Sequence, residues 1–417
     1  MNINRDSYLN KLIRHKHNGF IKIISGIRRC GKSYLLFELF KNHLLKEQSV
    51  PESHIITIQL DDRKYLKYQD PDACYNYVES QIQDSDMYYL LLDEVQMMKD
   101  FESVLNGFLH IKNLDAYVTG SNSKFLSSDI VTEFRGRGDE IRMYPLNFSE
   151  YYSVAGGDWN RAWDEYCLYG GMPAIFKFNT DSDKANYLQN LFKETYIKDV
   201  VERNGIRNRT EFEQLVNIVA SNIGSLTSVK KLADSFQSVA KNSISEPTLN
   251  QYLEYLSEAF LISKVQRYDI KGKKYLNSPC KYYFVDSGLR NARLNFRQTE
   301  VNHIMENVIY NELVMRGYQV DVGNIGIRER EEEQYVRKQL EVDFVANQGS
   351  KRYYIQSALE MPTPEKREQE EKSLLSIGDS FKKIIIVEKN IVPKNDENGI
   401  SIIGLKDFLL NTESLDF

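Results

Sequence analysis

The sequence has few cysteines, no long apolar run and no secretory leader. Its four cysteines (Cys30, Cys74, Cys167 and Cys280) are far apart and form no CxxC or Cys/His pair that could hold zinc. The longest apolar runs, such as Tyr88–Leu92, are far shorter than the roughly 20 residues that cross a bilayer. The first twenty residues contain no apolar stretch typical of a signal peptide. We therefore expect a cytoplasmic protein with reduced thiols and no membrane partner.

The chain also lacks an excess of charge of one sign. Its net charge of -5 and isoelectric point near 5.9 exclude a wholly basic nucleic-acid binder, but they leave room for a local basic patch. The apolar fraction of 41% and the charged fraction of 27% are typical of a folded globular protein. A length of 417 residues exceeds one ordinary core and predicts several domains.

A phosphate-binding loop is predicted near the N-terminus. The alternating segment Phe20–Ser25 is suited to a buried strand, and it leads into GIRRCGKS at Gly26–Ser33 and then into a helical pattern. Glycines let the loop backbone turn its N–H groups toward phosphates, and the helix N-terminus adds a positive dipole end. The alternative is a plain glycine turn with an exposed lysine. We expect an ATP site made by Gly26, Ile27, Arg28, Arg29, Cys30, Gly31, Lys32, Ser33 and Tyr34.

Within this site, Lys32 is expected to bind the β and γ phosphates, and Ser33 to ligate Mg²⁺. A second apolar run, Met87–Leu92, is typical of a central parallel strand and ends in Asp93 and Glu94. Ligands bind at the carboxyl ends of such strands, so Asp93 is the expected second magnesium ligand and Glu94 the expected general base. The alternative is two solvent-facing acids after a strand.

Three further polar residues are candidates for catalysis. Ser121 and Asn122 end the strand predicted in Leu114–Asn122, where they could hydrogen-bond the γ-phosphate or the attacking water, or could serve only their own turn. Arg137 is our choice for an arginine finger, since only arginine offers a rigid fork that stays ionised. If Arg137 acts across a subunit boundary, the protein must be a homo-oligomer; if it serves its own site, a monomer suffices.

These motifs together resemble bacterial and archaeal AAA-family ATPases that carry a conserved, largely uncharacterised C-terminal region. The resemblance rests on GIRRCGKS, LLLDEVQ, VTGSNS, FRGR, PLNFSEY, YGGMP, YFVDSGLRN and LEVDFVA in that order, and it covers nearly the whole chain. It implies an α/β AAA-type P-loop domain with five parallel strands and a helical lid. It also marks Lys32, Ser33, Asp93 and Glu94 as nucleotide residues and places Arg5 near the nucleotide.

We predict four domains: the P-loop core at 1–147, an aromatic-rich helical lid at 148–205, a winged-helix-like domain at 206–290 and a nuclease-like domain at 291–417. The winged-helix pattern is three short helices and a hairpin around the KGKK turn, Lys271–Lys274. The exposed face of its last helix carries Glu246, Glu254 and Glu258, which would repel phosphate, whereas the wing lysines favour DNA. The alternative is a module that docks on protein.

The order of elements in the last domain resembles the PD-(D/E)XK nuclease fold. Glu306 and Asp343 fit the first two acidic positions of that motif, but the third reads Gln356-Ser357-Ala358 and has lost its lysine. We therefore expect a degenerate site whose scaffold is kept for binding. The charge run at 327–339 is interpreted as a solvated loop.

These observations predict a Mg²⁺-dependent ATPase whose nucleotide cycle acts on a macromolecular partner, either DNA or protein. Two alternatives stay open: an ATP-gated DNA-processing nuclease, and a slow nucleotide switch that works through protein contacts. The sequence does not separate ATP from GTP.

Overall fold

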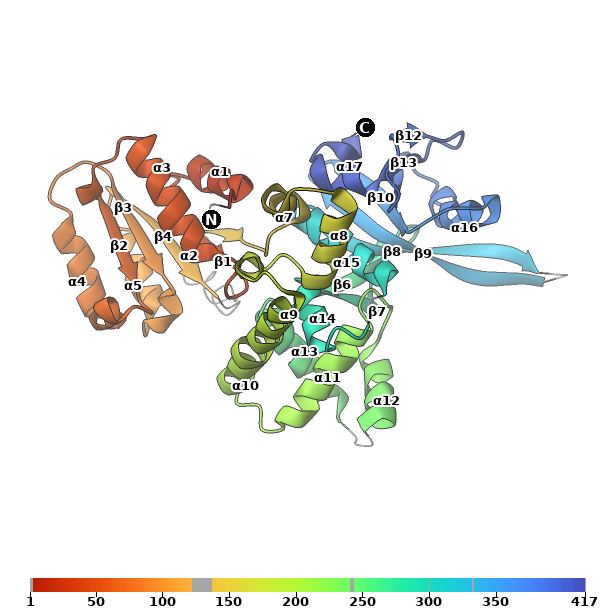
Figure 1. The fold of residues 1–417 in the computed structure, drawn as a ribbon, viewed down its shortest axis with the longest axis horizontal. Helices are drawn as coiled ribbons and strands as arrows, with labels where there is room; N and C mark the ends of the chain where they lie inside the picture. The colour runs from red at the N-terminus through yellow and green to blue at the C-terminus, as the bar shows by residue number, and fades with distance from the viewer. Residues whose placement is uncertain (1–2, 122–136, 241–243, 299, 332–333, 417) are drawn as a thin grey trace. The chain divides into compact units, whose positions relative to one another are not determined.

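The computed structural model describes residues 3–121, 137–240, 244–298, 300–331 and 334–416. These residues form two compact units (Figure 1). The N-terminal unit is Met1–Pro145 with Glu258–Phe260, and the C-terminal unit is Leu146–Ser257 with Leu261–Phe417.

A five-stranded sheet forms the centre of the N-terminal unit. Its strands, in spatial order, are β2 (Ile55–Gln59), β3 (Tyr88–Asp93), β4 (Leu114–Gly120), β1 (Ile21–Ser25) and β5 (Gly138–Arg142). Every neighbouring pair is parallel, so all carboxyl ends lie at one edge. β1 and β3 are buried along their whole length because helices cover both faces of such a sheet. The parallel α/β sheet predicted from the sequence is confirmed.

The helices of this unit are α1 (Asp6–Arg14), α4 (Pro71–Gln81), α5 (Phe101–Phe108) and one continuous helix that starts at Lys32. That helix comprises α2 (Lys32–Tyr34), a π-helical segment at Leu35–Phe40 and α3 (Lys41–Lys46). Its buried residues include Leu35, Leu36 and Phe40. The helix therefore holds its N-terminus fixed at the end of β1, where the glycine loop joins them.

The C-terminal unit contains a mixed sheet of eight strands. In spatial order they are β12 (Lys394–Asn395), β13 (Ser401–Gly404), β11 (Lys382–Val387), β10 (Lys351–Ala358), β9 (Gln334–Gln348), β8 (Gln319–Glu331), β6 (Ile262–Asp269) and β7 (Lys274–Phe284). The hairpin expected as a wing, β6–β7, thus continues the sheet of the last 120 residues. The division into four domains stays a prediction.

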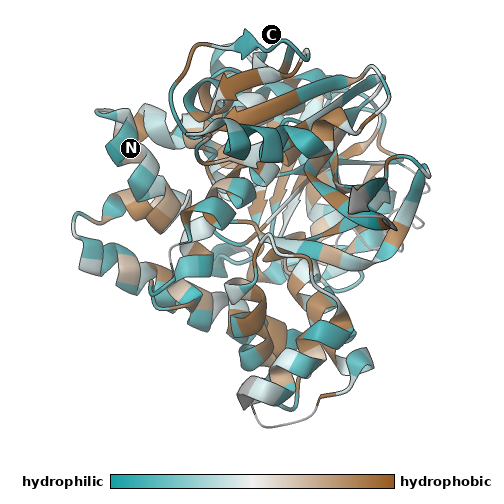
Figure 2. Ribbon diagram, turned by 90° about the vertical axis from the view of Figure 1, so that its right-hand side faces the viewer, coloured by the Kyte–Doolittle hydropathy of each residue, from teal (hydrophilic) through white to brown (hydrophobic). Residues whose placement is uncertain are grey.

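Helices flank this sheet and form the rest of the unit. They are α7 (Phe148–Ala155), α8 (Trp159–Tyr169), α9 (Asp181–Asn190), α10 (Lys198–Arg203), α11 (Arg209–Ser221), α12 (Val229–Ala240), α13 (Glu246–Glu258), α14 (Ser287–Arg293), α15 (Val301–Met315), α16 (Pro364–Leu375) and α17 (Leu405–Leu410). Many of them show apolar and polar stripes in Figure 2, as expected for helices packed on one side. Among the described residues, no helix is both long and apolar enough to cross a bilayer.

The aromatic segment after residue 147 packs within the C-terminal unit. Phe148 lies edge-on to Trp159, Trp163 and Tyr166, with ring centroids 4.7 to 5.7 Å apart. The Asp286 carboxylate, at the start of α14, accepts a hydrogen bond of 2.6 Å from the Gly171 N–H. The rings around Phe148 therefore form a core, as their spacing along the helices predicts.

One prediction about this unit was wrong. The charge run at 327–339, expected as a solvated loop, lies in β8 and β9, which extend from the unit as a two-stranded arm (Figure 1). Arg328 pairs with Arg337, and Arg330 with Tyr335, in antiparallel register. Hydrogen bonds between β8 and β9 satisfy the backbone N–H and C=O groups of this segment, and they do not require one side of the strands to be apolar. The alternation of apolar and polar residues that predicts a strand is therefore absent from this part of the sequence.

Candidate nucleotide-binding site

The glycine loop has the backbone that its sequence predicts. Gly26 has φ of +141° and Gly31 has φ of +105°, in a range that side chains rarely adopt. A Cβ at Gly26 would lie 2.1 Å from the Met143 carbonyl oxygen. Met143 in turn donates its N–H to the Ser25 carbonyl oxygen over 2.7 Å, which holds the chain after β5 against the end of β1. Only glycine fits at the first position of this loop.

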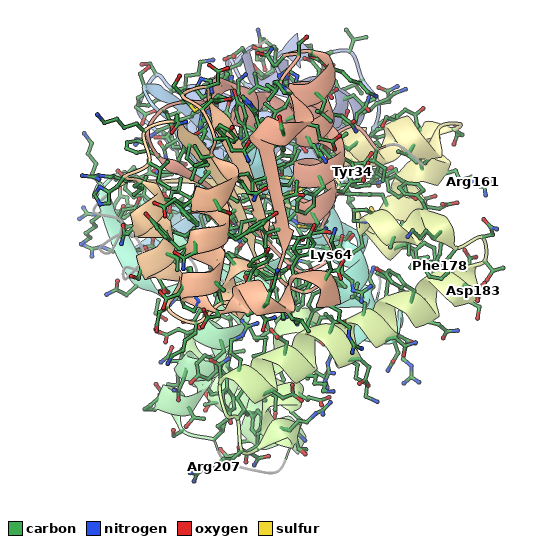
Figure 3. The ribbon with its side chains drawn as sticks, turned by 90° about the vertical axis from the view of Figure 1, so that its left-hand side faces the viewer. Tyr34, Lys64, Arg161, Phe178, Asp183 and Arg207 are labelled. Atoms are coloured by element: carbon green, nitrogen blue, oxygen red, sulfur yellow. The ribbon has the colours of Figure 1, made fainter. Side chains whose placement is uncertain are left out.

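Lys32 is buried at the start of the helix and turns back over the loop. Its ammonium donates to the carbonyl oxygens of Gly26 at 3.0 Å and Ile27 at 3.1 Å. An ammonium has three donors, and these bonds use two of them. The Lys32 ammonium is thus fixed against the backbone of the glycine loop, near the N-terminus of the helix. Tyr34, labelled in Figure 3, lies on the same helix, and its hydroxyl accepts a hydrogen bond from the Ile3 N–H at 3.2 Å.

Ser33 and Asp93 lie together although sixty residues separate them. The Ser33 hydroxyl lies near enough to the Asp93 carboxylate to lower its pKa, and the Thr119 hydroxyl on the neighbouring strand β4 donates a hydrogen bond to the same carboxylate. Burial raises the pKa of Asp93, and the hydrogen bonds from Thr119 and Ser33 partly offset the rise. The partly exposed Ser33 hydroxyl and the buried Asp93 carboxylate are the kind of oxygen ligands that Mg²⁺ favours in phosphate sites.

Glu94 follows directly in a left-handed conformation, with φ of +51°. Its N–H donates to the Thr119 hydroxyl oxygen at 3.0 Å, and its carboxylate accepts hydrogen bonds from Gln96 and, at 3.2 Å, from Ser121. The turn therefore directs the Glu94 carboxylate toward the end of β4, while Asp93 faces Ser33. Thr119 and Gln96 were missed as site residues. The motifs VTGSNS and LLLDEVQ contain both. The strand register brings Thr119 to the two acids, and the turn after Glu94 brings Gln96 back to its carboxylate.

Two arginines border the loop. Arg5, only 1% exposed, donates to the carbonyl oxygens of Cys30 at 3.2 Å and Tyr144 at 2.7 Å, so the N-terminal segment is tied to the phosphate loop. The Arg28 Nε donates to the Ser121 hydroxyl at 3.3 Å. Arg28 thereby links the loop to the Glu94 cluster. Arg29 is exposed at the outer side of the loop, and Cys30 and Ile27 are buried beneath it.

The structure does not bring Arg137 to this loop. β5 runs parallel to β1 with Gly138 beside Ile21, and the Arg137 carbonyl accepts a hydrogen bond from the Ile21 N–H. Arg137 therefore lies at the amino-terminal ends of the strands, whereas the loop follows their carboxyl ends. A finger in its own site is excluded by this register, and only an action on another subunit stays a prediction. Asn122 lies outside the described residues.

The residues present fit a nucleoside triphosphate with Mg²⁺. Gly26 lets the loop backbone keep its positive φ where it packs against Met143, Lys32 supplies a fixed positive charge, and Ser33 and Asp93 supply adjoining oxygens. Glu94 lies beside them without a cation bonded to its carboxylate among the described residues.

The nuclease-like residues form a second cluster of charge, in the C-terminal unit. Glu306 on α15 and Asp343 on β9 come together as predicted, and the Gln356 side chain accepts a 3.4 Å hydrogen bond from the Asp343 N–H. The ammonium of Lys281, on β7, lies 2.7 Å from both Glu306 and Glu341 and 3.7 Å from Asp343. Sequence reasoning missed Lys281 because it comes from the hairpin assigned to another domain.

These carboxylates do not fit a magnesium site. Lys281 already places a buried cation among them, and a second cation beside it would be repelled. Among the described residues, only His54, Asp84 and Asp86 bring three His, Cys, Asp or Glu ligand atoms within 4.8 Å of one another. The cluster therefore gives no support to the nuclease alternative.

Comparison with known proteins agrees with the geometry. The AAA domain family matches residues 18–152, and a domain family of unknown function (DUF8612) matches residues 160–300. An uncharacterized protein of Haemophilus influenzae is 31% identical over 98% of this chain and 98% of its own. One of Methanocaldococcus jannaschii is 29% identical over 95% of this chain and 86% of its own.

Solved structures give a weaker likeness. The Orc1 protein of Aeropyrum pernix, solved in complex with DNA, is 11% identical, with 70% of this chain and 92% of that chain covered and a TM-score of 0.28. Cdc6p of Pyrobaculum aerophilum is also 11% identical, with 73% and 95% covered and a TM-score of 0.28. Scores this low carry no argument about function. The family match and the full-length relative show that the chain belongs to the AAA-family ATPases with this conserved C-terminal region.

Proposed function

We propose that the protein hydrolyses ATP with Mg²⁺ at the site formed by the glycine loop, Asp93 and Glu94. The observation that carries this proposal is the convergence of Ser33, Asp93 and Thr119, with Glu94 held on the same threonine. This network brings together a loop for phosphates, an oxygen pair for a metal and a carboxylate for water. Mg²⁺, when bound, would neutralise phosphate charge and polarise the transferring group.

Each residue then has a distinct task. Lys32 holds positive charge against the phosphates, and Ser33 with Asp93 would hold the metal. Glu94 accepts the proton of the attacking water at its carboxylate, which Gln96 and Ser121 orient. Thr119 positions both acids through one hydroxyl, because it bonds the Asp93 carboxylate and the Glu94 N–H. Arg5 keeps the loop in place from the N-terminal side.

Two variants test the assignment. Lys32→Ala is expected to abolish nucleotide binding, while Glu94→Gln should keep binding and lower kcat by about 10²–10⁴-fold, the usual contribution of a general base. Lys46→Ala and Glu79→Gln serve as matched controls because both side chains are exposed on helices of the same unit. ATP turnover at the native rate by folded Lys32→Ala protein would refute the assignment.

We infer further that the nucleotide cycle acts on a macromolecular partner through the C-terminal unit. DNA and protein are both candidate partners, and homo-oligomerisation would let Arg137 act on a neighbouring site. Glu94→Gln protein, which should retain ATP, is the suitable trap for copurified nucleic acid or protein. Slow turnover with tightly retained nucleotide in the native protein would instead favour a switch that works through protein contacts.

A further inference from the structure

The arm formed by β8 and β9 separates its charges onto two faces. Side chains alternate along a strand, and paired residues share a face, so Arg328, Arg337 and Tyr335 point to one side of the arm. Ile327, Glu329 and Lys338 point to the other side. This separation cannot be seen in the overall composition of the run, which contains nearly equal numbers of acids and bases.

On the side with Glu329, the charged groups pair with one another. Glu329 lies 2.9 Å from the Lys338 ammonium and 2.7 Å from that of Lys372 on α16. Farther toward the base of the arm, Ile325 and Val342 on this side belong to the buried core. This face therefore docks the arm on the unit.

The other side is basic and open to solvent. Arg328 and Arg337 are exposed, and within the described residues neither lies within 4.0 Å of a carboxylate. Tyr335, at the outer end, is 74% exposed. We call this side the arginine face.

The arginine face continues onto the β6–β7 hairpin. β6 pairs with β8, and the Lys271 ammonium donates to the Gly326 carbonyl oxygen at 3.1 Å. Arg267 and Lys274 line an open hollow of about 430 Å³ with Lys271, and the Arg267 side chain is hydrogen-bonded to Asn324. Asp269, the acid in this hollow, caps its own turn by accepting from the Gly272 N–H. The wing lysines and the arm thus form one basic surface.

We propose that this surface, from Lys271 and Lys274 to Arg328 and Arg337, binds the phosphate backbone of duplex DNA. From Asn324 to Arg328, strand β8 rises about 14 Å at roughly 3.4 Å per residue, which is the length of duplex axis occupied by about four successive phosphates of one DNA strand. Planar guanidinium groups favour phosphate, and an exposed aromatic ring beside them adds apolar contact with sugars or bases. Glu331, Glu332 and Glu333 separate Arg328 from Arg337 in the sequence and would repel phosphate, so the proposed contact is confined to Lys271, Lys274, Arg328 and Arg337.

This inference gives the proposed partner a chemical class and therefore rests on the proposed function. Its binding test needs no nucleotide. A labelled DNA duplex three helical turns long is titrated with the full chain, and binding is followed by fluorescence anisotropy at several salt concentrations. Arg328→Gln/Arg337→Gln is compared with Lys338→Gln/Lys372→Gln, which removes the same charge from the opposite face.

Each lost phosphate contact lowers the slope of log affinity against log salt by about 0.9. The variant Arg328→Gln/Arg337→Gln removes two such contacts and should therefore lower the magnitude of the slope by about 1.8. Its loss of affinity between about 50 and 200 mM salt should then be about 12-fold smaller than that of the native protein. The lysine pair should leave the slope nearly native. Equal effects of the two pairs, or no binding by the native protein, would overturn the proposal.

Two further measurements separate this proposal from the ATPase assignment. Polyglutamate at equal charge should displace DNA poorly; equally strong displacement would indicate an acidic protein partner and overturn the proposal. The Arg328→Gln/Arg337→Gln protein should turn over ATP at the native basal rate. The Lys32→Ala protein should bind the duplex as tightly as the native protein does. If the native protein binds the duplex but does not hydrolyse ATP, the proposed function is refuted and the DNA-binding proposal stands.

Discussion

Replacing Lys281 with methionine tests whether its ammonium is the cation of the nuclease-like cluster. The Lys281 side chain is 3% exposed, and its ammonium contacts Glu306 and Glu341 at 2.7 Å each. Burial lowers the pKa of Lys281, but the carboxyl groups of Glu306, Asp343 and Glu341 raise this pKa far above the ordinary lysine value. Methionine keeps most of the side-chain volume but leaves the carboxylates without a counter-charge.

The expected cost follows from this geometry. Removing one partner of a buried ion pair costs about 3–5 kcal/mol, because the remaining charge stays buried and uncompensated. For a cooperative unit of this size, about 1 kcal/mol shifts the melting temperature by about 2–4 °C, so the expected loss is about 6–20 °C. Differential scanning calorimetry at neutral pH would measure it, with Lys351→Met, an exposed lysine paired with Asp416, as the control.

A rescue experiment distinguishes charge from packing. Lys281→Met/Glu306→Gln should recover most of the lost stability, because the buried acid that bonds Lys281 and Tyr283 is then neutral. Mn²⁺ should not stabilise the native protein through this cluster, so the Mn²⁺-induced shift in melting temperature should be the same in native and Glu306→Gln proteins. A Mn²⁺ shift present in the native protein and absent from Glu306→Gln would refute the reasoning.

Three smaller predictions follow. Burial and repulsion from Glu306 raise the pKa of Asp343 to about 8, so the folded state holds a proton that the unfolded state releases above about pH 4. Stability should therefore fall by up to about 1.4 kcal/mol per pH unit between about pH 5 and 8 in urea titrations, and Asp343→Asn should flatten that slope. Gly26→Ala should abolish ATP binding in an equilibrium assay, whereas Gly378→Ala, where the new methyl meets open space, should not. Thr119→Val should lower kcat by about 10–100-fold with the fold retained, as measured by turnover and circular dichroism, since groups that hydrogen-bond and orient a metal ligand typically contribute that much; native turnover would contradict the role of its hydroxyl.

The N-terminal sheet and its site were largely predictable because the governing signals are local. The loop needs glycine where φ is positive, and a run of apolar residues that ends in two acids predicts a central strand with ligands at its end. Those constraints predicted Lys32, Ser33, Asp93 and Glu94 as one site. Their hydrogen bonds now show how the side chains meet, while their catalytic roles stay predictions.

What could not be predicted depends on which strands are neighbours. Thr119 reaches the two acids only through the register of β3 and β4. Arg137 was assigned from its residue type and its proximity to other arginines, yet the parallel pairing of β5 with β1 places it at the opposite edge of the sheet. Lys281 joins Glu306 because α15 packs against both β7 and β9, which spacing along the chain does not reveal.

Lys281 and the arginine face are physically connected through β9. Glu341 and Asp343 contact the Lys281 ammonium, and Arg337 lies on the same side of β9, an even number of residues from both. Uncompensated carboxylates at the base of this surface would repel the phosphates that the arginines attract, and the low dielectric around them would strengthen that repulsion. The Lys281 ammonium offsets part of this negative charge and so weakens the repulsion. The proposed DNA-binding surface therefore has an internal cation at its base, where the neighbouring carboxylates would otherwise repel phosphate most strongly.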